Sequence, residues 1–211
     1  MIIAISGKKQ SGKNTVSDMI ADILDKKRDI EIEEGSFAKI LKEFLAKIIG
    51  VDSGMFEDEQ FKTKSLGEEF DIVDKSKIES KVLYSNITPR FLMEYVGTEL
   101  IRKQWNKNIW VYGLLNKYKE IRRKYNFDNK QLVFVVSDLR FRNELEIFKR
   151  EERNLYTIRV VRNEVAQESK SESETDLDNY KDWDYVIYNN GTEIDLRKEV
   201  EKALLKFNII S

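Results

Sequence analysis

Nine residues near the start of the chain combine glycines, lysines and hydroxyl side chains at a spacing suited to binding phosphate. The segment Gly7-Lys8-Lys9-Gln10-Ser11-Gly12-Lys13-Asn14-Thr15 follows an apolar run and precedes apolar residues at helical spacing. Its glycines let backbone N–H groups converge on one anion, and a helix start adds its positive dipole end. Lys13 would place its charge beside the β- and γ-phosphates of a nucleoside triphosphate. We interpret the segment as a phosphate-binding loop rather than an ordinary glycine turn.

The loop departs from the strict pattern at one position. Ser or Thr usually follows the lysine directly, whereas here Asn14 follows Lys13 and Thr15 comes one place later. The spacing Gly-Lys-x-Thr is common in nucleoside monophosphate kinases, while switch GTPases and motor ATPases usually carry Gly-Lys-Ser or Gly-Lys-Thr. Thr15 is therefore our candidate for contacting phosphate, or magnesium through water. The departure favours phosphoryl transfer to a small molecule.

The composition excludes several kinds of catalysis. The 211 residues contain no cysteine and no histidine, which removes thiolate chemistry, disulfides, Ser-His-Asp hydrolysis and histidine-bound zinc. Charged residues make up 36% of the chain, yet the net charge is −1, so no basic surface for nucleic acid is expected. The sequence shows no signal peptide and no membrane span. We expect a cytoplasmic protein, in the host cytoplasm if the source is viral.

Apolar runs alternate with amphipathic stretches over most of the chain. The alternation predicts one α/β domain over 1–211, with a five-stranded parallel sheet flanked by helices in three layers. Strands are predicted at about 2–6, 30–34, 131–137, 156–161 and 185–188. Helices are predicted at 14–26, 38–49, 89–103, 109–125, 143–150 and 194–207. Two segments without clear periodicity, 52–85 and 163–180, fall where phosphate-loop proteins carry substrate-covering insertions.

Charged residues follow the apolar run at 131–137, where a parallel strand would end. Asp138, Arg140 and Arg142 would then lie at the carboxyl edge of the sheet, the edge at which open α/β folds bind ligands. An aspartate there can orient water on magnesium or anchor an arginine, and guanidinium groups can bind phosphate through paired hydrogen bonds. A surface ion-pair cluster is the alternative, and the strand-end position favours the functional interpretation.

A predicted helix beginning at Pro89 supplies a second candidate group. Thr88, directly before the proline, is suited to capping the helix. Arg90 would stand on its first turn, and Gly97 would let a ligand or a neighbouring helix approach closely. These residues alone do not separate a ligand site from a packing site. Lys42 lies in the helix predicted at 38–49, and on the sequence alone we expect it on the solvated face of that helix.

Three motifs in this order resemble those of the phage-type deoxynucleoside monophosphate kinases, a branch of the phosphate-loop kinases. They are Ser-Gly-x3-Ser-Gly-Lys-x-Thr at 6–15, Arg-x-Leu-Met-x3-Gly-Thr at 90–98, and Asp-x-Arg-Phe-x-Asn-Glu at 138–144. The acidic tail at 173–180 is also similar, although the family often has histidine where Ser171 stands. The resemblance covers nearly the whole chain. It implies the phosphate-loop kinase fold, with a monophosphate-binding insertion at about 52–85 and a lid at about 163–180.

The resemblance implies transfer of the γ-phosphoryl group of ATP, with Mg²⁺, to a deoxynucleoside 5′-monophosphate. The partners would be these small molecules, without nucleic acid or membrane, and the family permits homodimers. Matching positions imply a catalytic set of Lys13, Arg90, Asp138 and Arg140. They imply an ATP site of Lys9, Gln10, Gly12, Lys13, Asn14, Thr15 and Arg162. They imply a monophosphate site of Leu41, Lys42, Lys62, Arg90, Gly97, Thr98, Trp110, Asp138, Arg140 and Glu144.

Two other functions remain open on the sequence. An animal-type phosphomevalonate kinase shares the loop, a Ser-Asp-x-Arg strand end and an acidic tail, but the helix at 90–98 and the segment 52–85 fit nucleotide kinases better. A non-catalytic ATP-binding regulatory protein would need the loop but not the set Arg90, Asp138 and Arg140. Neither the accepted base nor the preference for deoxyribose follows from the residues themselves.

Overall fold

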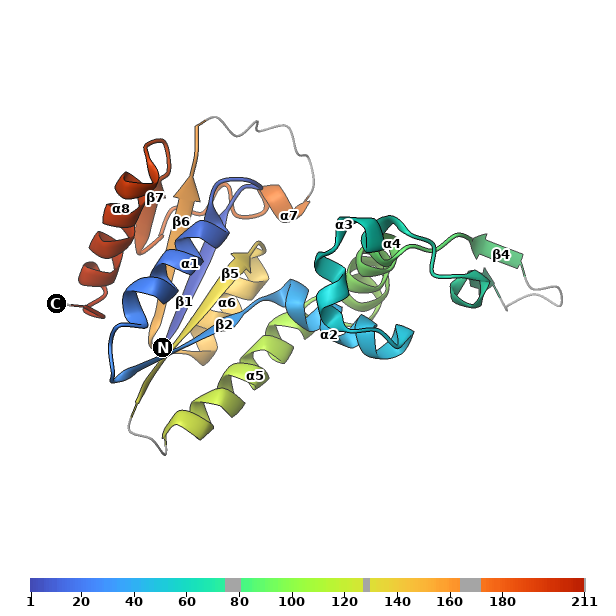
Figure 1. Cartoon of the computed structure of the whole chain (residues 1–211), viewed down its shortest axis with the longest axis horizontal. Coiled ribbons are helices and arrows are strands. Elements are labelled where there is room, and N and C mark those ends of the chain that lie inside the picture. Colours follow the sequence, from blue (N-terminus) through green and yellow to red (C-terminus); the bar gives the residue numbers. More distant parts are fainter. Residues whose placement is uncertain (75–80, 127–129, 164–171, 211) are drawn as a thin grey trace. The chain divides into compact units, whose positions relative to one another are not determined.

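The computed structural model describes residues 1–74, 81–126, 130–163 and 172–210 (Figure 1). Its contacts divide the chain into two compact units, Met1–Phe37 with Val111–Ser211, and Ala38–Trp110. The described residues of the expected insertion at 52–85 lie in the second unit, and residues 75–80 lie outside the described part; the single domain with insertions stays a prediction. The expected lid at 163–180 lies partly outside the described residues, as does Ser171.

The first unit is built on a parallel sheet with strand order β2-β5-β1-β6-β7. The five strands confirm the predicted ones, and their bounds are β1 (Ile2–Gly7), β2 (Ile30–Gly35), β5 (Gln131–Leu139), β6 (Leu155–Val161) and β7 (Tyr185–Tyr188). Four successive residues of β1, from 2 to 5, are fully buried, as expected for a central strand covered on both faces. The phosphate-binding loop therefore begins at the middle of the carboxyl edge.

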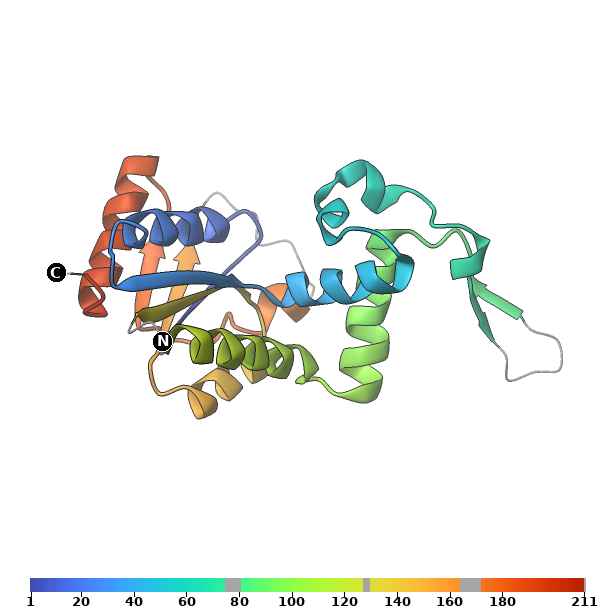
Figure 2. The same ribbon diagram turned by 60° about the horizontal axis from the view of Figure 1, so that its bottom comes forward.

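Helices cover both faces of this sheet (Figure 2). On one face α1 (Lys13–Leu24) and α8 (Glu193–Lys206) pack over Ile3 and Ile5 of β1. On the other face lie α5 (Ile109–Asn126) and α6 (Arg142–Glu151), where Tyr118 of α5 packs on Phe134 of β5 with ring centres 5.4 Å apart. These helices confirm the predicted ones to within two residues at each end. The short helix α7 (Glu172–Thr175) was not predicted.

The second unit is mostly helical and has a core of its own around Leu45 and Phe56. Its elements are α2 (Phe37–Ile49), η1 (Ser53–Glu57), α3 (Glu59–Thr63), η2 (Glu68–Phe70), the hairpin β3 (Ile72–Asp74) with β4 (Lys81–Tyr84), α4 (Pro89–Glu94) and η3 (Tyr95–Trp105). The predicted cap is confirmed, because the Thr88 hydroxyl accepts the Phe91 N–H at 3.2 Å. The single α-helix predicted at 89–103 is wrong in its second half, where η3 is π-helical.

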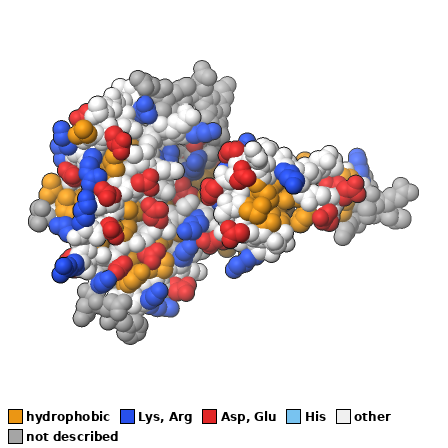
Figure 3. All heavy atoms as spheres, in the orientation of Figure 1, with side chains coloured by type: hydrophobic (Ala, Val, Ile, Leu, Met, Phe, Trp, Pro, Cys, Tyr) orange, Lys and Arg blue, Asp and Glu red, His pale blue; other side chains and the backbone are white. Residues whose placement is uncertain are grey.

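Charged side chains of both signs are interspersed on the face of the first unit seen in Figure 3. The expectation that nucleic acid is not a partner stays a prediction. Within the described ranges, no helix is both long and apolar enough to cross a membrane.

Strand β5 contains an irregularity where it reaches the carboxyl edge. Its pairing with β1 changes register between Ala4, opposite Val136, and Ser6, opposite Leu139. The extra residue on β5 falls beside Asp138, and such bulges redirect side chains near functional sites. The side-chain direction of Asp138 is thus set by a feature that strand periodicity cannot predict.

Gly35 ends β2 in a space too small for any side chain. A Cβ there would lie 2.3 Å from Cζ of Phe134 and 2.9 Å from Cδ1 of Leu114. Because Phe134 is fully buried, it cannot swing into solvent. We predict that Gly35→Ala lowers the free energy of unfolding by about 1–3 kcal/mol, measured by urea denaturation. The same change in a Phe134→Leu background should cost less, and equal costs in both backgrounds would contradict this explanation.

Candidate functional site

The predicted phosphate-binding loop joins β1 to α1 with two residues in the left-handed region. Gln10 has φ 63° and Gly12, directly before α1, has φ 97°. Asn189, which follows β7, donates from its side-chain amide to the Ser11 carbonyl at 2.9 Å. A Cβ on Gly12 would lie 2.4 Å from that amide nitrogen. Glycine is therefore required at 12 both by its backbone conformation and by the close approach of Asn189.

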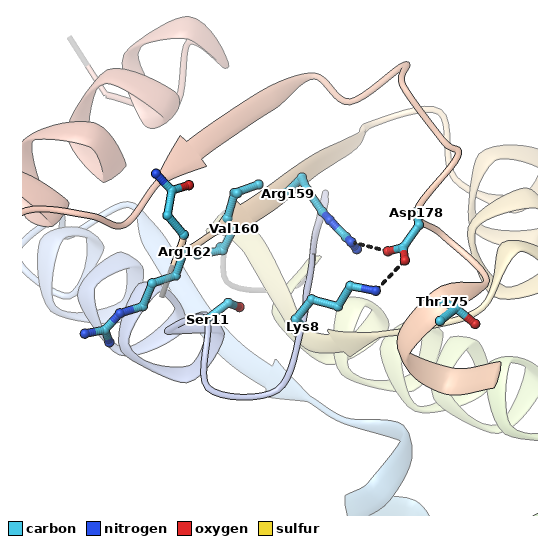
Figure 4. A pocket seen from close by; sticks show the side chains of 9 residues that line it. Lys8, Ser11, Arg159, Val160, Arg162, Thr175 and Asp178 are labelled. Atoms are coloured by element: carbon cyan, nitrogen blue, oxygen red, sulfur yellow. Dashed lines mark hydrogen bonds and ion pairs between the residues drawn. The ribbon is translucent and has the colours of Figure 1, made fainter. Parts of the chain in front are cut away.

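A cavity of about 630 Å³ opens beside this loop, a size typical of small-molecule sites (Figure 4). It is lined by Lys8, Ser11, Arg159, Val160, Val161, Arg162, Asn163, Thr175 and Asp178. Asp178 forms ion pairs with Lys8 and, at 3.0 Å, with Arg159. Arg162 extends away from that group, on the other side of Ser11 (Figure 4). The cavity thus combines cationic side chains with the loop expected to bind phosphate.

The Ser11 hydroxyl is buried and has no hydrogen-bond partner within the described part of the chain. The whole residue is inaccessible to solvent, and Ser11 is one of the residues that line the cavity. An unsatisfied buried hydroxyl costs about 1–3 kcal/mol, so such groups in native proteins call for an explanation. A ligand atom in the cavity would provide the missing partner.

Lys13 is nearly removed from solvent at the start of α1. The residue is 8% exposed, and its ammonium group donates to the carbonyls of Gly7 and Lys8 at 2.8 and 2.6 Å. Burial, with a further contribution from the positive charge of Arg140, lowers the pKa of Lys13 to about 8. Added negative charge beside this group would favour its protonated form.

Two carboxylates of the strand-end cluster bind backbone N–H groups. Asp138 accepts from the Ser36 hydroxyl at 2.9 Å and from the Phe37 N–H, at the start of α2, at 3.0 Å. Glu144 is buried and accepts the N–H groups of Arg140 and the next residue, both at 3.1 Å. These contacts fix the turn from which the Arg140 side chain projects. Direct contact of Asp138 or Glu144 with a substrate stays a prediction.

In the second unit, two residues of the predicted monophosphate site share one carboxylate. Glu59 pairs with Lys62 at 2.9 Å and with the guanidinium group of Arg90. Lys42 pairs with Glu57 at 2.7 Å. The structure therefore brings Lys62 and Arg90 together although they lie on α3 and α4.

The uncharged residues of the predicted monophosphate site also lie close together in this unit. A Cβ on Gly97 would lie 2.7 Å from Cδ2 of Leu41, and the Gly97 carbonyl accepts the indole N–H of Trp110 at 3.0 Å. Thr98 follows on η3 and is half-buried. The Gly97 position thus serves close packing of α2 against η3.

Four other predicted ATP-site residues belong to the loop and the first turn of α1. Lys9 and Gln10 are exposed, as are Asn14 and Thr15 on the first turn of α1. Thr15 faces a second hollow, which includes Asp18 and Glu193, rather than the cavity beside Ser11.

The sequence interpretation missed four side chains that line the cavity, hold the loop or bind predicted site residues. Arg159 lines the cavity from within β6, Asn189 holds the loop, and carboxylates at Glu59 and Glu174 bind the predicted cations. The acidic tail containing Glu174 and the Asn190-Gly191 pair beside Asn189 were visible signals. Neither signal indicates which loop these residues contact.

Comparison with known proteins identifies the relatives of this chain. A model of the deoxynucleotide monophosphate kinase family matches residues 21–200. A protein of Acanthamoeba polyphaga mimivirus, named "Putative deoxynucleotide monophosphate kinase", is 30% identical over 200 residues, which cover 91% of this chain and 90% of the viral protein. The match agrees with the resemblance in the sequence motifs and not with a phosphomevalonate kinase. The chain belongs to the deoxynucleotide monophosphate kinase family.

Proposed function

We propose that the first unit binds ATP and that the second binds a deoxynucleoside 5′-monophosphate. The chain then transfers the γ-phosphoryl group from ATP to the monophosphate. The observation that carries this proposal is the loop at the end of β1. It combines a buried ammonium group with a buried hydroxyl that has no partner among the described residues, beside a cavity of about 630 Å³. Backbone N–H groups of Gln10 and Gly12, with the first turn of α1, would bind the phosphates, because the Lys9 N–H already donates to Glu174.

The reaction needs little covalent help from the protein. An oxygen of the acceptor phosphate attacks the γ-phosphorus, the bond from that phosphorus to the bridging oxygen breaks, and ADP leaves. The acceptor phosphate is already anionic, so alignment and charge stabilisation are the main requirements. Lys13, Arg140 and Arg90 would stabilise negative charge on the transferring group and the acceptor.

We also propose that Mg²⁺ enters bound to ATP. Mg²⁺ in such sites keeps several waters and binds phosphate oxygens, so few protein donors are needed. The Thr15 hydroxyl, exposed on the first turn of α1, would contact the ion only through one of those waters, because Thr15 lines the second hollow rather than the cavity beside Ser11. Asp138 could orient another water if its present hydrogen bonds to Ser36 and Phe37 were exchanged.

The acceptor would be held by two groups of the second unit. Lys42, Lys62 and Arg90 are the cations suited to its phosphate. Leu41, Gly97, Thr98 and Trp110 would then contact the nucleoside. A homodimer, a cytoplasmic location and an adenine contact by Arg162 belong to the same proposal as expectations from the family resemblance.

A coupled assay of ADP release tests this function. ATP and magnesium would be supplied with dTMP, dGMP, dCMP, dAMP, each ribose counterpart or phosphomevalonate as the single acceptor. Turnover with one or more deoxynucleotides is expected and would name the base. Turnover with phosphomevalonate alone would overturn the proposal. So would the absence of turnover with every acceptor despite measurable ATP binding.

We predict that Arg90→Ala chiefly impairs use of the monophosphate. Loss of a guanidinium group from the acceptor phosphate should lower kcat/KM for the acceptor by about 10²–10³-fold, by comparison with loss of one oxyanion donor. The Kd for ATP should stay within about threefold, because the proposed ATP residues lie in the other unit. Steady-state kinetics and calorimetry give both values. Arg102→Ala on η3 makes the same charge change and should leave kcat/KM nearly unchanged, whereas a large loss of ATP binding in Arg90→Ala would refute the assignment.

We predict that ATP binding weakens as pH rises through the pKa of Lys13. The free protein loses the Lys13 proton near pH 8, whereas bound phosphates favour the ammonium form, so binding takes up protons around that pH. The Kd for ATP should be flat below about pH 7 and approach a tenfold rise per pH unit well above 8. Titration calorimetry from pH 6.5 to 9.5 measures this. In Lys13→Arg the side chain stays charged, so the rise should disappear; equal slopes in both proteins would contradict the prediction.

A further inference from the structure

Glu174 connects the phosphate-binding loop to Arg140. One carboxylate oxygen accepts the Lys9 N–H at 2.7 Å, and the other accepts from the Arg140 guanidinium at 2.6 Å. The Glu174 carbonyl also accepts a hydrogen bond from the Lys8 ammonium group. The two partners of the carboxylate belong to different connections, β1–α1 and β5–α6, so the contact spans the carboxyl edge of the first unit's sheet.

The burial of this carboxylate makes the contact specific. The Glu174 side chain is only 7% exposed, and a buried charge is costly unless it is paired and hydrogen-bonded. Both of its oxygens have such partners, one a backbone N–H and one a guanidinium. A charge-assisted bond of this kind holds a flexible arginine in one arrangement.

Two roles could explain a carboxylate at this position. It could occupy the place of a phosphate group and leave when ATP binds, or it could stay and orient Arg140. The residues that line the 630 Å³ cavity include Thr175 and Asp178 but not Glu174. The 7% exposure of Glu174 and its hydrogen bonds to both a backbone N–H and the Arg140 guanidinium favour the second role.

We propose that Glu174 is a positioning residue for phosphoryl transfer, which holds the Arg140 guanidinium against the backbone of the phosphate-binding loop. The inference rests on the roles proposed above for the loop and for Arg140. It assigns Glu174 no contact with a reacting atom. Its effect comes from the direction in which it holds Arg140 while negative charge develops on the transferring group.

The first test is Glu174→Gln, which keeps the shape of the side chain and an oxygen for the Lys9 N–H but removes the charge that holds Arg140. We expect kcat to fall about 10–100-fold while the Kd for ATP changes less than about threefold. Glu174→Asp keeps the charge and should recover part of kcat. Glu172→Gln makes the same change at an exposed position of α7 and should leave kcat unchanged.

A double-mutant cycle with Arg140→Ala completes the experiment. If Glu174 acts through Arg140, Glu174→Gln should change kcat less than about twofold in the Arg140→Ala background. Multiplicative losses would overturn the proposal, as would tighter ATP binding with unchanged kcat, which indicates a carboxylate in the place of phosphate. A lowered Tm with unchanged kcat would also overturn it, because the role would be structural. If Arg140→Ala alone leaves kcat unchanged, the proposed role of Arg140 fails; if that variant is impaired but Glu174→Gln is not, only the positioning role fails.

Discussion

The buried ammonium group of Lys13 is the interaction on which the candidate site depends. At 8% exposure this charge has lost most of its water, and the carbonyls of Gly7 and Lys8 replace that water in part. Those carbonyls belong to a loop whose path requires left-handed conformations at Gln10 and Gly12. The loop is in turn fixed by a central strand that is covered on both faces. A phosphate anion beside Lys13 would offset the desolvation that the fold imposes.

Three further cations around the first unit's loop, Lys8, Arg140 and Arg159, are paired with one acidic segment. Glu174 binds Arg140, Asp178 binds Lys8 and Arg159, and Asp176 accepts the backbone N–H of Arg142 at 2.6 Å. Several of these groups are partly exposed, with Arg140 and Asp178 each at 38%. An ion pair of that exposure, such as Asp178 with Lys8, contributes little net free energy, so exchange of the Asp178 carboxylate for a phosphate is inexpensive. The Glu174 carboxylate, at 7% exposure, differs in this respect. Selection for phosphate therefore depends on the geometry of the loop more than on an excess of positive charge.

The parts of the fold that follow local patterns were predictable. Short apolar patterns identified the five strands, and the glycine-lysine spacing identified the loop, because both depend on residues close together in the chain. The π-helical stretch η3 was not predictable, since its apolar residues also suit an ordinary α-helix. The hairpin β3–β4 was missed because the segment around it shows no clear alternation.

Most of the site beyond the loop depends on pairing between distant residues. Arg90 and Glu59 are 31 positions apart, Arg140 and Glu174 are 34 apart, and Asn189 contacts a loop residue 178 positions away. Composition and periodicity do not indicate which distant residues will contact each other. The resemblance to a family supplied Arg90 and Lys62 as candidates, but it gave no reason for them to meet. The structure supplies that reason in the shared carboxylate of Glu59.

The carboxylates of this site hold donors in place rather than accept protons. Glu174 and Glu59 bind cations, Glu144 binds two backbone N–H groups, and Asp138 binds a hydroxyl and the N–H at the start of α2. That arrangement suits an acceptor that is already an anion and needs no general base. A carboxylate acting as a base would need a free oxygen directed at the substrate, whereas both oxygens of Asp138 and of Glu174 have protein partners. The geometry therefore supports catalysis by positioning and charge stabilisation, which is what phosphoryl transfer between two phosphates requires.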